Sequence, residues 1–137
     1  MINSRKLEDL TPECRILCQK LIDECQKIGI DILVTSTYRD IESQNALYEQ
    51  GRSKPGAKVT NAKGGQSFHQ YRIAFDVVPI ENGKPMWNSV IKWAKIGKIG
   101  RELGLEWAGT WKTFPEMPHF QMPGYRIVDS KLVKVTK

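Results

Sequence analysis

Apolar residues recur every three or four positions from Thr11 to Ile28, and this spacing predicts an amphipathic helix. Thr11 suits the N-cap, Pro12 suits the first helical position, and Gly29 ends the helix. The apolar face consists of Cys14, Leu17, Cys18, Leu21, Ile22, Cys25 and Ile28. Because all 3 cysteines of the chain lie on this face, we expect buried thiols in a reducing compartment rather than disulfides.

The rest of the chain predicts two more helices and several strands. The β-branched segment 30–36 predicts a strand, and Asp40 is placed to cap a helix over 41–50 that Gly51 ends. Further extended segments are expected at 73–79, 105–109 and 119–122, with a last hairpin over 125–135. A third helix is expected over 88–103, and its predicted inward residues are Val90, Ile91, Trp93, Ala94, Ile96, Ile99 and Leu103.

Helices and strands do not alternate regularly in this order, which favours an α+β fold. We expect a small, mostly antiparallel sheet packed by about three helices. A chain of 137 residues without repeats or linkers predicts a single domain over residues 1–137. Segment 51–66 lacks periodicity, contains no acidic residue and carries four basic ones, and a loop of this kind is usually functional.

Charge and composition exclude several classes of protein. With 40% hydrophobic and 26% charged residues the chain is typical of a folded globular protein. No apolar run reaches the ~20 residues that span a bilayer, and the polar N-terminus shows no secretory signal. The net charge of +6 favours an anionic partner such as nucleic acid, anionic lipid or an acidic wall polymer.

The chain has 2 histidines, and each has a carboxylate at a useful spacing. His69 is followed by Asp76, and His119 is preceded by Glu116. Catalytic zinc takes three protein ligands and keeps one position for water, so two imidazoles and Asp76 would suffice. Glu116 is then left to act as the general base. Asp76 lies in the apolar segment 74–78, where an unpaired carboxylate would be costly to bury.

Other interpretations of these residues stay open from spacing alone. A single histidine is often an ordinary core or surface residue, and Asp76 could pair with Arg39 or Arg72 rather than with a metal. The basic residues also allow a nucleic-acid-binding domain, although no recognised signature of that class is present.

The pattern Ser67-x-His69-x-x-x-x-Ala74-x-Asp76, followed by Glu116-x-x-His119-Phe120, resembles the zinc-binding signature of the VanY/VanX-type D,D-peptidases, the M15 peptidases. Segment 36–40 resembles the S-x-Y-R element of this family, with Gln44 placed as in its members. Further short motifs resemble the subgroup of phage endolysins and bacterial wall enzymes that cut L-alanyl-D-glutamate bonds. These are Leu47-Tyr48-x-x-Gly51-Arg52, Pro55-Gly56, Val59-Thr60, Gly64-Gly65-x-Ser67 and Glu106-Trp107-x-Gly109-x-Trp111.

The resemblance implies a Hedgehog/D,D-peptidase-like fold and one zinc ion per chain. It implies His69, Asp76 and His119 as the metal ligands, Glu116 as the general base and Arg39 as the cation that stabilises developing negative charge. Substrate contacts are expected from Ser67, Gln44, Tyr38 and Trp111. Two positions depart from the family pattern, because the family usually has Gly at position 72 and the subgroup often has Asp at position 116.

The expected function is hydrolysis of the L-alanyl-D-glutamate bond in peptidoglycan stem peptides by a zinc endolysin or autolysin. The alternatives are a D-alanyl-D-alanine carboxypeptidase or dipeptidase of the same fold, and a non-catalytic wall-binding module. The expected partners are the stem peptide and the anionic wall, bound by a monomer without a separate wall-binding domain. Without a signal peptide, the chain is expected to reach the wall through a holin pore, or as an exported bacterial enzyme.

Overall fold

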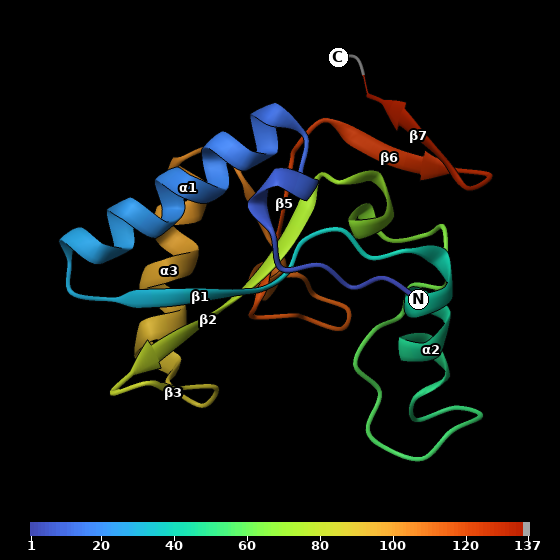
Figure 1. Cartoon of the computed structure of the whole chain (residues 1–137), viewed down its shortest axis with the longest axis horizontal. Helices are drawn as coiled ribbons and strands as arrows, with labels where there is room; N and C mark the ends of the chain where they lie inside the picture. The colour runs from blue at the N-terminus through green and yellow to red at the C-terminus, as the bar shows by residue number, and fades with distance from the viewer. Residues whose placement is uncertain (136–137) are drawn as a thin grey trace.

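The computed structural model describes residues 1–135 and contains three α-helices with a mostly antiparallel set of strands. Figure 1 shows the elements in order along the chain. The α-helices are α1 (Pro12–Lys27), α2 (Ile41–Glu49) and α3 (Val90–Glu102). The strands are β1 (Asp31–Ser36), β2 (Ala74–Glu81), β3 (Lys84–Pro85), β4 (Glu106–Trp107), β5 (His119–Gln121), β6 (Tyr125–Val128) and β7 (Lys131–Lys134). Short 3-10 helices are η1 (Leu7–Asp9), η2 (Phe68–Tyr71) and η3 (Ala108–Thr110).

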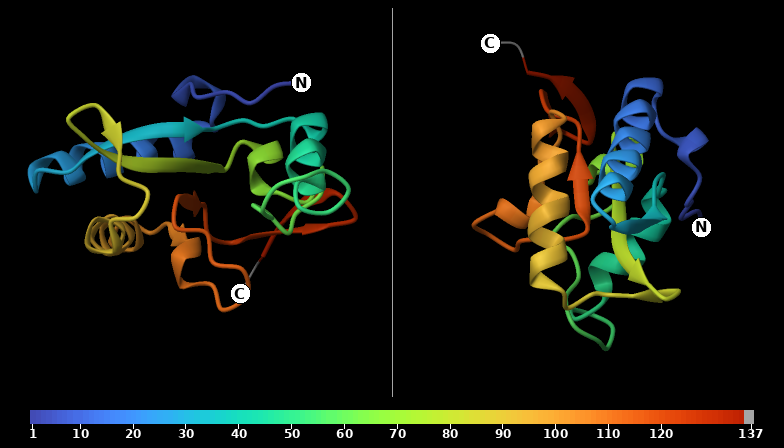
Figure 2. Two further views of the ribbon diagram at one scale, coloured as in Figure 1. Left: turned by 90° about the horizontal axis from the view of Figure 1, so that it is seen from below. Right: turned by 90° about the vertical axis from the view of Figure 1, so that its left-hand side faces the viewer.

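The main sheet has the strand order β1-β2-β5-β4, and β3 pairs with the end of β2. Every pair in it is antiparallel, as is the separate hairpin of β6 and β7. The predicted α+β class is therefore confirmed. Helices α1 and α3 contact each other, with α1 against β1 and α3 against β4, while α2 lies beyond the far end of β1 (Figures 1 and 2).

Helix α1 begins and ends close to where the sequence predicts. The Thr11 hydroxyl accepts a hydrogen bond from the Cys14 amide, and Gly29 follows the helix with φ of +80°. The three cysteines on its inner face are free and fully buried. Burial raises the pKa of Cys14 and Cys18 to about 12, so these thiols stay protonated and behave as apolar core groups.

Aromatic rings form the centre of the core beneath the sheet. Phe120 stacks on Phe75 at 5.8 Å and on Trp107 at 6.3 Å between ring centroids. Helix α3 approaches these rings closely because Gly97 and Gly100 face them. A Cβ atom on Gly97 would come within 2.3 Å of Trp107, and one on Gly100 within 2.4 Å of Phe120. These two glycines therefore set the distance between α3 and the sheet.

The start of α3 differs from the sequence prediction. The buried face of this helix consists of Trp93, Ile96, Gly97 and Gly100. Val90 and Ile91 are 77% and 71% exposed, and Ala94 is also exposed, although all three were expected to point inward. The helix meets the core along a narrow line formed by Trp93, Ile96 and the two glycines, so its first turn extends beyond the core.

Candidate active site

A row of side chains crosses the neighbouring strands β1, β2 and β5 at the end of β1. In the strand register, Ser36 pairs with Asp76, and Asp76 pairs with His119. Residues directly opposite in antiparallel strands project from the same face of the sheet. The sheet therefore brings Asp76 and His119 together although 43 positions separate them in the sequence.

His69 reaches the same row from η2. The Ser67 hydroxyl accepts a hydrogen bond from the His69 amide, and Gln70 completes a capping box with the backbone of Ser67. Arg72 then adopts the left-handed conformation with φ of 64°, which ends η2 and turns the chain into β2. The resemblance implies Gly at this position, the residue that adopts this conformation without strain.

Three potential metal-ligating atoms, one each from His69, Asp76 and His119, lie within 4.8 Å of one another. Nε2 of His69 and Nδ1 of His119 each lie 3.1 Å from Oδ1 of Asp76. The other ring nitrogen of each histidine faces an oxygen. Nδ1 of His69 lies 2.8 Å from the Thr37 carbonyl oxygen, and Nε2 of His119 lies 2.8 Å from Oε1 of Gln121.

These outer contacts assign the ring protons. A carbonyl oxygen only accepts hydrogen bonds, so neutral His69 carries its proton on Nδ1 and neutral His119 carries its proton on Nε2. The lone pairs on Nε2 of His69 and Nδ1 of His119 then both point at Oδ1 of Asp76. Only a proton or a metal cation between the nitrogens and this oxygen relieves their mutual repulsion. Metal-binding histidines in proteins commonly donate their second N–H to such an outer oxygen. The donor set of two imidazoles and one carboxylate therefore fits zinc.

The charges of the site shift the pKa values of its members. Burial lowers the pKa of His69, although the negative charge of Asp76 opposes this, so the ring is neutral near pH 7. Burial alone would raise the pKa of Asp76, but the two imidazoles outweigh it and hold the pKa well below its usual range. Burial alone would lower the pKa of His119, but the hydrogen bond to Asp76 outweighs burial, and the pKa of His119 is raised. Asp76 is thus ionised and attracts positive charge.

Arg39 is buried beside this cluster, and hydrogen bonds fix its guanidinium. Nη2 donates to the Ser36 hydroxyl at 3.0 Å and to Oδ2 of Asp76 at 3.3 Å, while Nη1 donates to Oε1 of Gln44 at 2.9 Å. Asp76 therefore faces the histidines with one oxygen and Arg39 with the other. The ion pair of Asp76 with Arg39, which was left open as an alternative to metal binding, forms alongside the contacts of Asp76 with the two histidines.

Glu116 lies on the loop that precedes β5. Its amide donates to the Ala108 carbonyl oxygen at 3.1 Å, and its own carbonyl accepts from the His119 amide at 3.2 Å, in a turn that contains Pro118. Burial raises the pKa of the Glu116 carboxyl, with opposing effects from His119 and Arg39. A carboxylate of raised pKa close to the histidine cluster has the properties of a general base.

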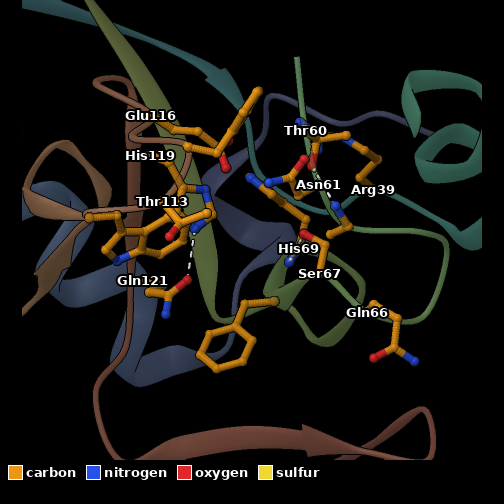
Figure 3. Close-up of a pocket in the computed structure, with 14 residues that line it drawn as sticks. Arg39, Thr60, Asn61, Gln66, Ser67, His69, Thr113, Glu116, His119 and Gln121 are labelled. Atoms are coloured by element: carbon orange, nitrogen blue, oxygen red, sulfur yellow. Dashed lines mark hydrogen bonds between the residues drawn. The ribbon is translucent and has the colours of Figure 1, made fainter. Parts of the chain in front are cut away.

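Two adjoining cavities contain these groups. The first, of about 340 Å³, is lined mostly by residues with polar side chains, and Figure 3 shows Glu116 and His119 facing Arg39, His69 and Ser67 across it. The second, of about 480 Å³, shares Arg39, Glu116 and His119 and extends toward the start of α3. The cluster therefore lies where the two cavities meet, accessible to a substrate that extends into both.

The four expected substrate contacts occupy different places. Ser67 and Trp111 line the first cavity, and the Trp111 ring lies 5.6 Å from that of His119. Gln44 is fully buried behind Arg39. The Tyr38 ring lies under the Arg72 guanidinium at 4.0 Å and lines neither cavity.

Several residues around the site were not anticipated from the sequence. Gln121 lies two positions after His119 in β5 and therefore shares its face, a signal that strand periodicity offered. The Thr37 carbonyl behind His69 has no sequence signal, because any residue supplies a carbonyl. Thr60 and Phe114 line both cavities from loops whose paths no periodicity predicts.

Curated relatives of the chain are wall peptidases. A family model described as D-alanyl-D-alanine carboxypeptidase matches residues 60–122. Peptidoglycan L-alanyl-D-glutamate endopeptidase CwlK of Bacillus subtilis (strain 168) is 38% identical over 103 residues, which are 69% of this chain and 62% of that protein. The L-alanyl-D-glutamate peptidase of Listeria phage A118 is 29% identical over 123 residues, covering 88% of this chain and 40% of the phage protein. The chain thus spans less than two thirds of each relative.

Solved structures share the fold. The L-Ala D-Glu endopeptidase ChiX of Serratia marcescens has a TM-score of 0.65 and 23% identity, covering 85% of this chain and 82% of ChiX. The vancomycin resistance D,D-pentapeptidase VanY, solved in complex with Zn(II), has a TM-score of 0.65 and 17% identity, covering 84% and 73% of the two chains. In the described part of the chain, no helix is long and apolar enough to cross a membrane. The chain is thus similar to the M15 peptidases in its fold and in the sequence of residues 60–122, the segment that contains all three members of the His-Asp-His cluster.

Proposed function

We propose that this chain is a zinc-dependent peptidoglycan peptidase that hydrolyses the L-alanyl-D-glutamate bond of stem peptides. The observation that carries the proposal is the convergence of His69, Asp76 and His119 at the junction of two cavities that also expose Glu116 and Arg39. The two curated relatives, both named for this bond, support the choice of substrate.

His69, Asp76 and His119 would hold the zinc ion. When bound, zinc acidifies a water molecule and polarises the scissile carbonyl. The hydrogen bonds to the Thr37 carbonyl and to Gln121 keep a lone pair of each imidazole directed inward. The chain thus supplies ligands whose orientation is fixed before the metal arrives.

Glu116 is proposed as the general base. Its carboxylate accepts a proton from the attacking water and returns it to the amine of the leaving D-glutamate. Because burial raises its pKa, the carboxylate takes up a proton more readily than a solvated glutamate would. The main-chain bonds to Ala108 and His119 hold the Glu116 backbone in place for both transfers.

Arg39 is proposed to stabilise the negative charge that develops on the carbonyl oxygen. The guanidinium is already held by Ser36, Asp76 and Gln44, so little reorganisation is needed when that charge forms. Direct substrate contacts are proposed for Ser67 and Trp111, which line the first cavity. For Gln44 and Tyr38 the proposed contribution is indirect, through the arginines that they contact.

A D-alanyl-D-alanine carboxypeptidase or dipeptidase is the second candidate. The description of the matching family model favours it, as does a glutamate at position 116, which resembles the D,D-enzymes of the family. The chemistry at the metal would be the same, and the difference would lie in which part of the stem peptide enters the two cavities.

Product analysis on purified walls tests the proposal. The chain is loaded with one equivalent of zinc, incubated with walls, and the soluble products are analysed by mass spectrometry with and without a chelator. Cleavage of the L-alanyl-D-glutamate bond leaves new N-terminal D-glutamate, whereas the second candidate releases D-alanine. Walls that stay intact under both conditions would contradict both candidates and favour a non-catalytic binding module.

The wall itself is the proposed partner. A monomer of net charge +6 would be attracted to anionic wall polymer, and that attraction would weaken as salt is added. We propose that the chain reaches the wall through a holin pore if it is phage-encoded, or by export if it is bacterial.

A further inference from the structure

The second cavity leads from the candidate active site to an apolar surface at the start of α3. Trp87 and Met117 line this cavity and also line a third one, of about 290 Å³, which reaches Val90. Trp87 is 50% exposed, Met117 40% and Val90 77%. We call these three residues the Trp87 face. It lies outside the first cavity, and the proposed mechanism does not use it.

Two indoles beneath the Trp87 face hold it in shape. Nε1 of Trp93 donates to the Trp87 carbonyl oxygen at 2.8 Å, and Nε1 of Trp107 donates to the Met117 carbonyl oxygen at 2.8 Å. The rings of Trp87 and Trp93 lie 6.4 Å apart. Both anchoring bonds end on carbonyl oxygens, so they fix the backbone that carries the exposed side chains of Trp87 and Met117. A surface fixed in this way loses little freedom when a ligand binds.

In the stem peptide a sugar lies close to the scissile bond. The amino group of L-alanine is joined through a lactyl group to N-acetylmuramic acid, so the sugar lies only a few bonds from the scissile carbonyl. A site that takes this bond must extend in two directions, toward the sugar and toward the D-glutamate carboxylate. Arg39 lines both cavities, and the first adds Asn61, Gln66 and Ser67, which suit carboxylates and amides. The second cavity leads instead to the aromatic Trp87 face.

Pyranose rings have apolar C–H faces that pack on indoles, and their amide and hydroxyl groups need polar partners at the edge. Trp87 offers an exposed indole, and the exposed Asn88 beside it lines the third cavity. We propose that the Trp87 face binds the N-acetylmuramic acid of the glycan strand, and so favours stem peptides still attached to glycan. This inference rests on the proposed function.

A pair of matched substrates tests the inference. One is the stem peptide attached to its disaccharide, and the other is the same peptide with an acetyl group in place of the lactyl sugar. We expect Trp87→Ala to lower kcat/KM on the disaccharide substrate by about tenfold, through KM, as is typical of losing one aromatic anchor. It should leave the acetylated peptide unchanged. The Trp93 bond survives the substitution because it ends on the backbone of Trp87.

Two further variants serve as controls. Trp87→Phe keeps an aromatic ring and should retain most of the preference for the disaccharide substrate. Ile16→Ala removes an equally exposed apolar side chain that lines none of the three cavities, and it should change neither substrate. Binding is checked separately by saturation-transfer NMR with the GlcNAc–MurNAc disaccharide alone.

The outcomes separate this inference from the proposed function. Cleavage of both substrates with equal efficiency by the wild type, or equal losses on both in Trp87→Ala, would overturn the sugar site and leave the peptidase standing. Failure to cleave either substrate would overturn the peptidase and the inference with it. A dimer that Trp87→Ala dissociates would assign the face to a second copy of the chain and so also overturn the inference.

Discussion

Gln44 accepts a hydrogen bond from Nη1 of Arg39 at 2.9 Å while having no exposed surface of its own. Its amide nitrogen donates to the Ala62 carbonyl oxygen at 2.8 Å. One buried side chain of α2 therefore ties the guanidinium at the candidate active site to the loop that lines the first cavity. This relationship makes Gln44 a positioning residue for Arg39.

Replacing Gln44 by alanine should lower kcat by roughly 10- to 100-fold, because the Arg39 guanidinium loses a fixed partner and shifts from its productive place. Zinc affinity should not change. Steady-state kinetics and a zinc titration check both expectations. Asn45→Ala is the matched control, since Asn45 anchors the same loop through the Gly64 amide at 2.8 Å without touching Arg39. Equal losses in the two variants would show that the loop, and not Arg39, carries the effect.

Substitutions at Glu116 and at His119 should distinguish proton transfer from metal binding. Glu116→Gln should retain zinc and lose about 100-fold or more in turnover, the usual contribution of a general base. His119→Ala should lose both zinc and activity, because it removes a ligand. Elemental analysis after dialysis, together with hydrolysis of wall peptides, measures the two quantities. Full zinc and full activity in both variants would rule out these assignments.

The raised pKa of Glu116 predicts a pH-dependent effect on stability in the metal-free protein. The folded state favours the protonated carboxyl, so stability falls as the pH rises from the unfolded-state pKa to the raised folded-state pKa and stays lower above it. Glu116→Gln should therefore have a higher Tm than the wild type at pH 7. The difference should disappear below about pH 4, where the carboxyl is neutral in the folded and unfolded states alike. Thermal melts across this range, with chelator present, provide the measurement; a Tm difference independent of pH would contradict the prediction.

Arg72 combines backbone strain with side-chain contacts. Its left-handed φ of 64° is unfavourable for a residue with a Cβ, yet its guanidinium lies over Tyr38 and donates to the Asp9 carbonyl oxygen at 3.0 Å. Arg72→Ala keeps the strain and loses the contacts, whereas Arg72→Gly loses both. We expect the alanine variant to be less stable than the glycine variant by about 1 kcal/mol in urea unfolding. Equal stabilities would mean that the strain is negligible.

The sequence predicted much of this architecture because local signals were strong. Thr11 and Asp40 cap α1 and α2 as expected, each accepting from the amide three residues later. The expected meeting of His69 and Asp76 becomes possible because η2 and the left-handed Arg72 turn the chain between them. Strand register then aligns Asp76 with His119.

The remaining features depend on contacts that local patterns do not encode. Val90 and Ile91 follow helical spacing, but the close approach of Gly97 and Gly100 to the core leaves the first turn of α3 outside it. Segment 105–109 was expected to be extended, yet only Glu106–Trp107 forms a strand before η3 begins. Gln44 is fully buried and contacts Arg39 instead of lining a cavity, and a resemblance in sequence does not reveal such burial.

The row that runs from Ser36 through Asp76 to His119 belongs to the sheet, whereas much of the wall of both cavities comes from the loops at 57–67 and 111–118. Insertions and substitutions in such loops disturb the scaffold little. A change of the cleaved bond therefore requires substitutions only in these loops, with Glu116 kept, while the sheet positions of Asp76 and His119 stay unchanged. Because the sheet holds Asp76 and His119 while the loops form the cavity walls, the specificity of this fold can be engineered by changing loop residues.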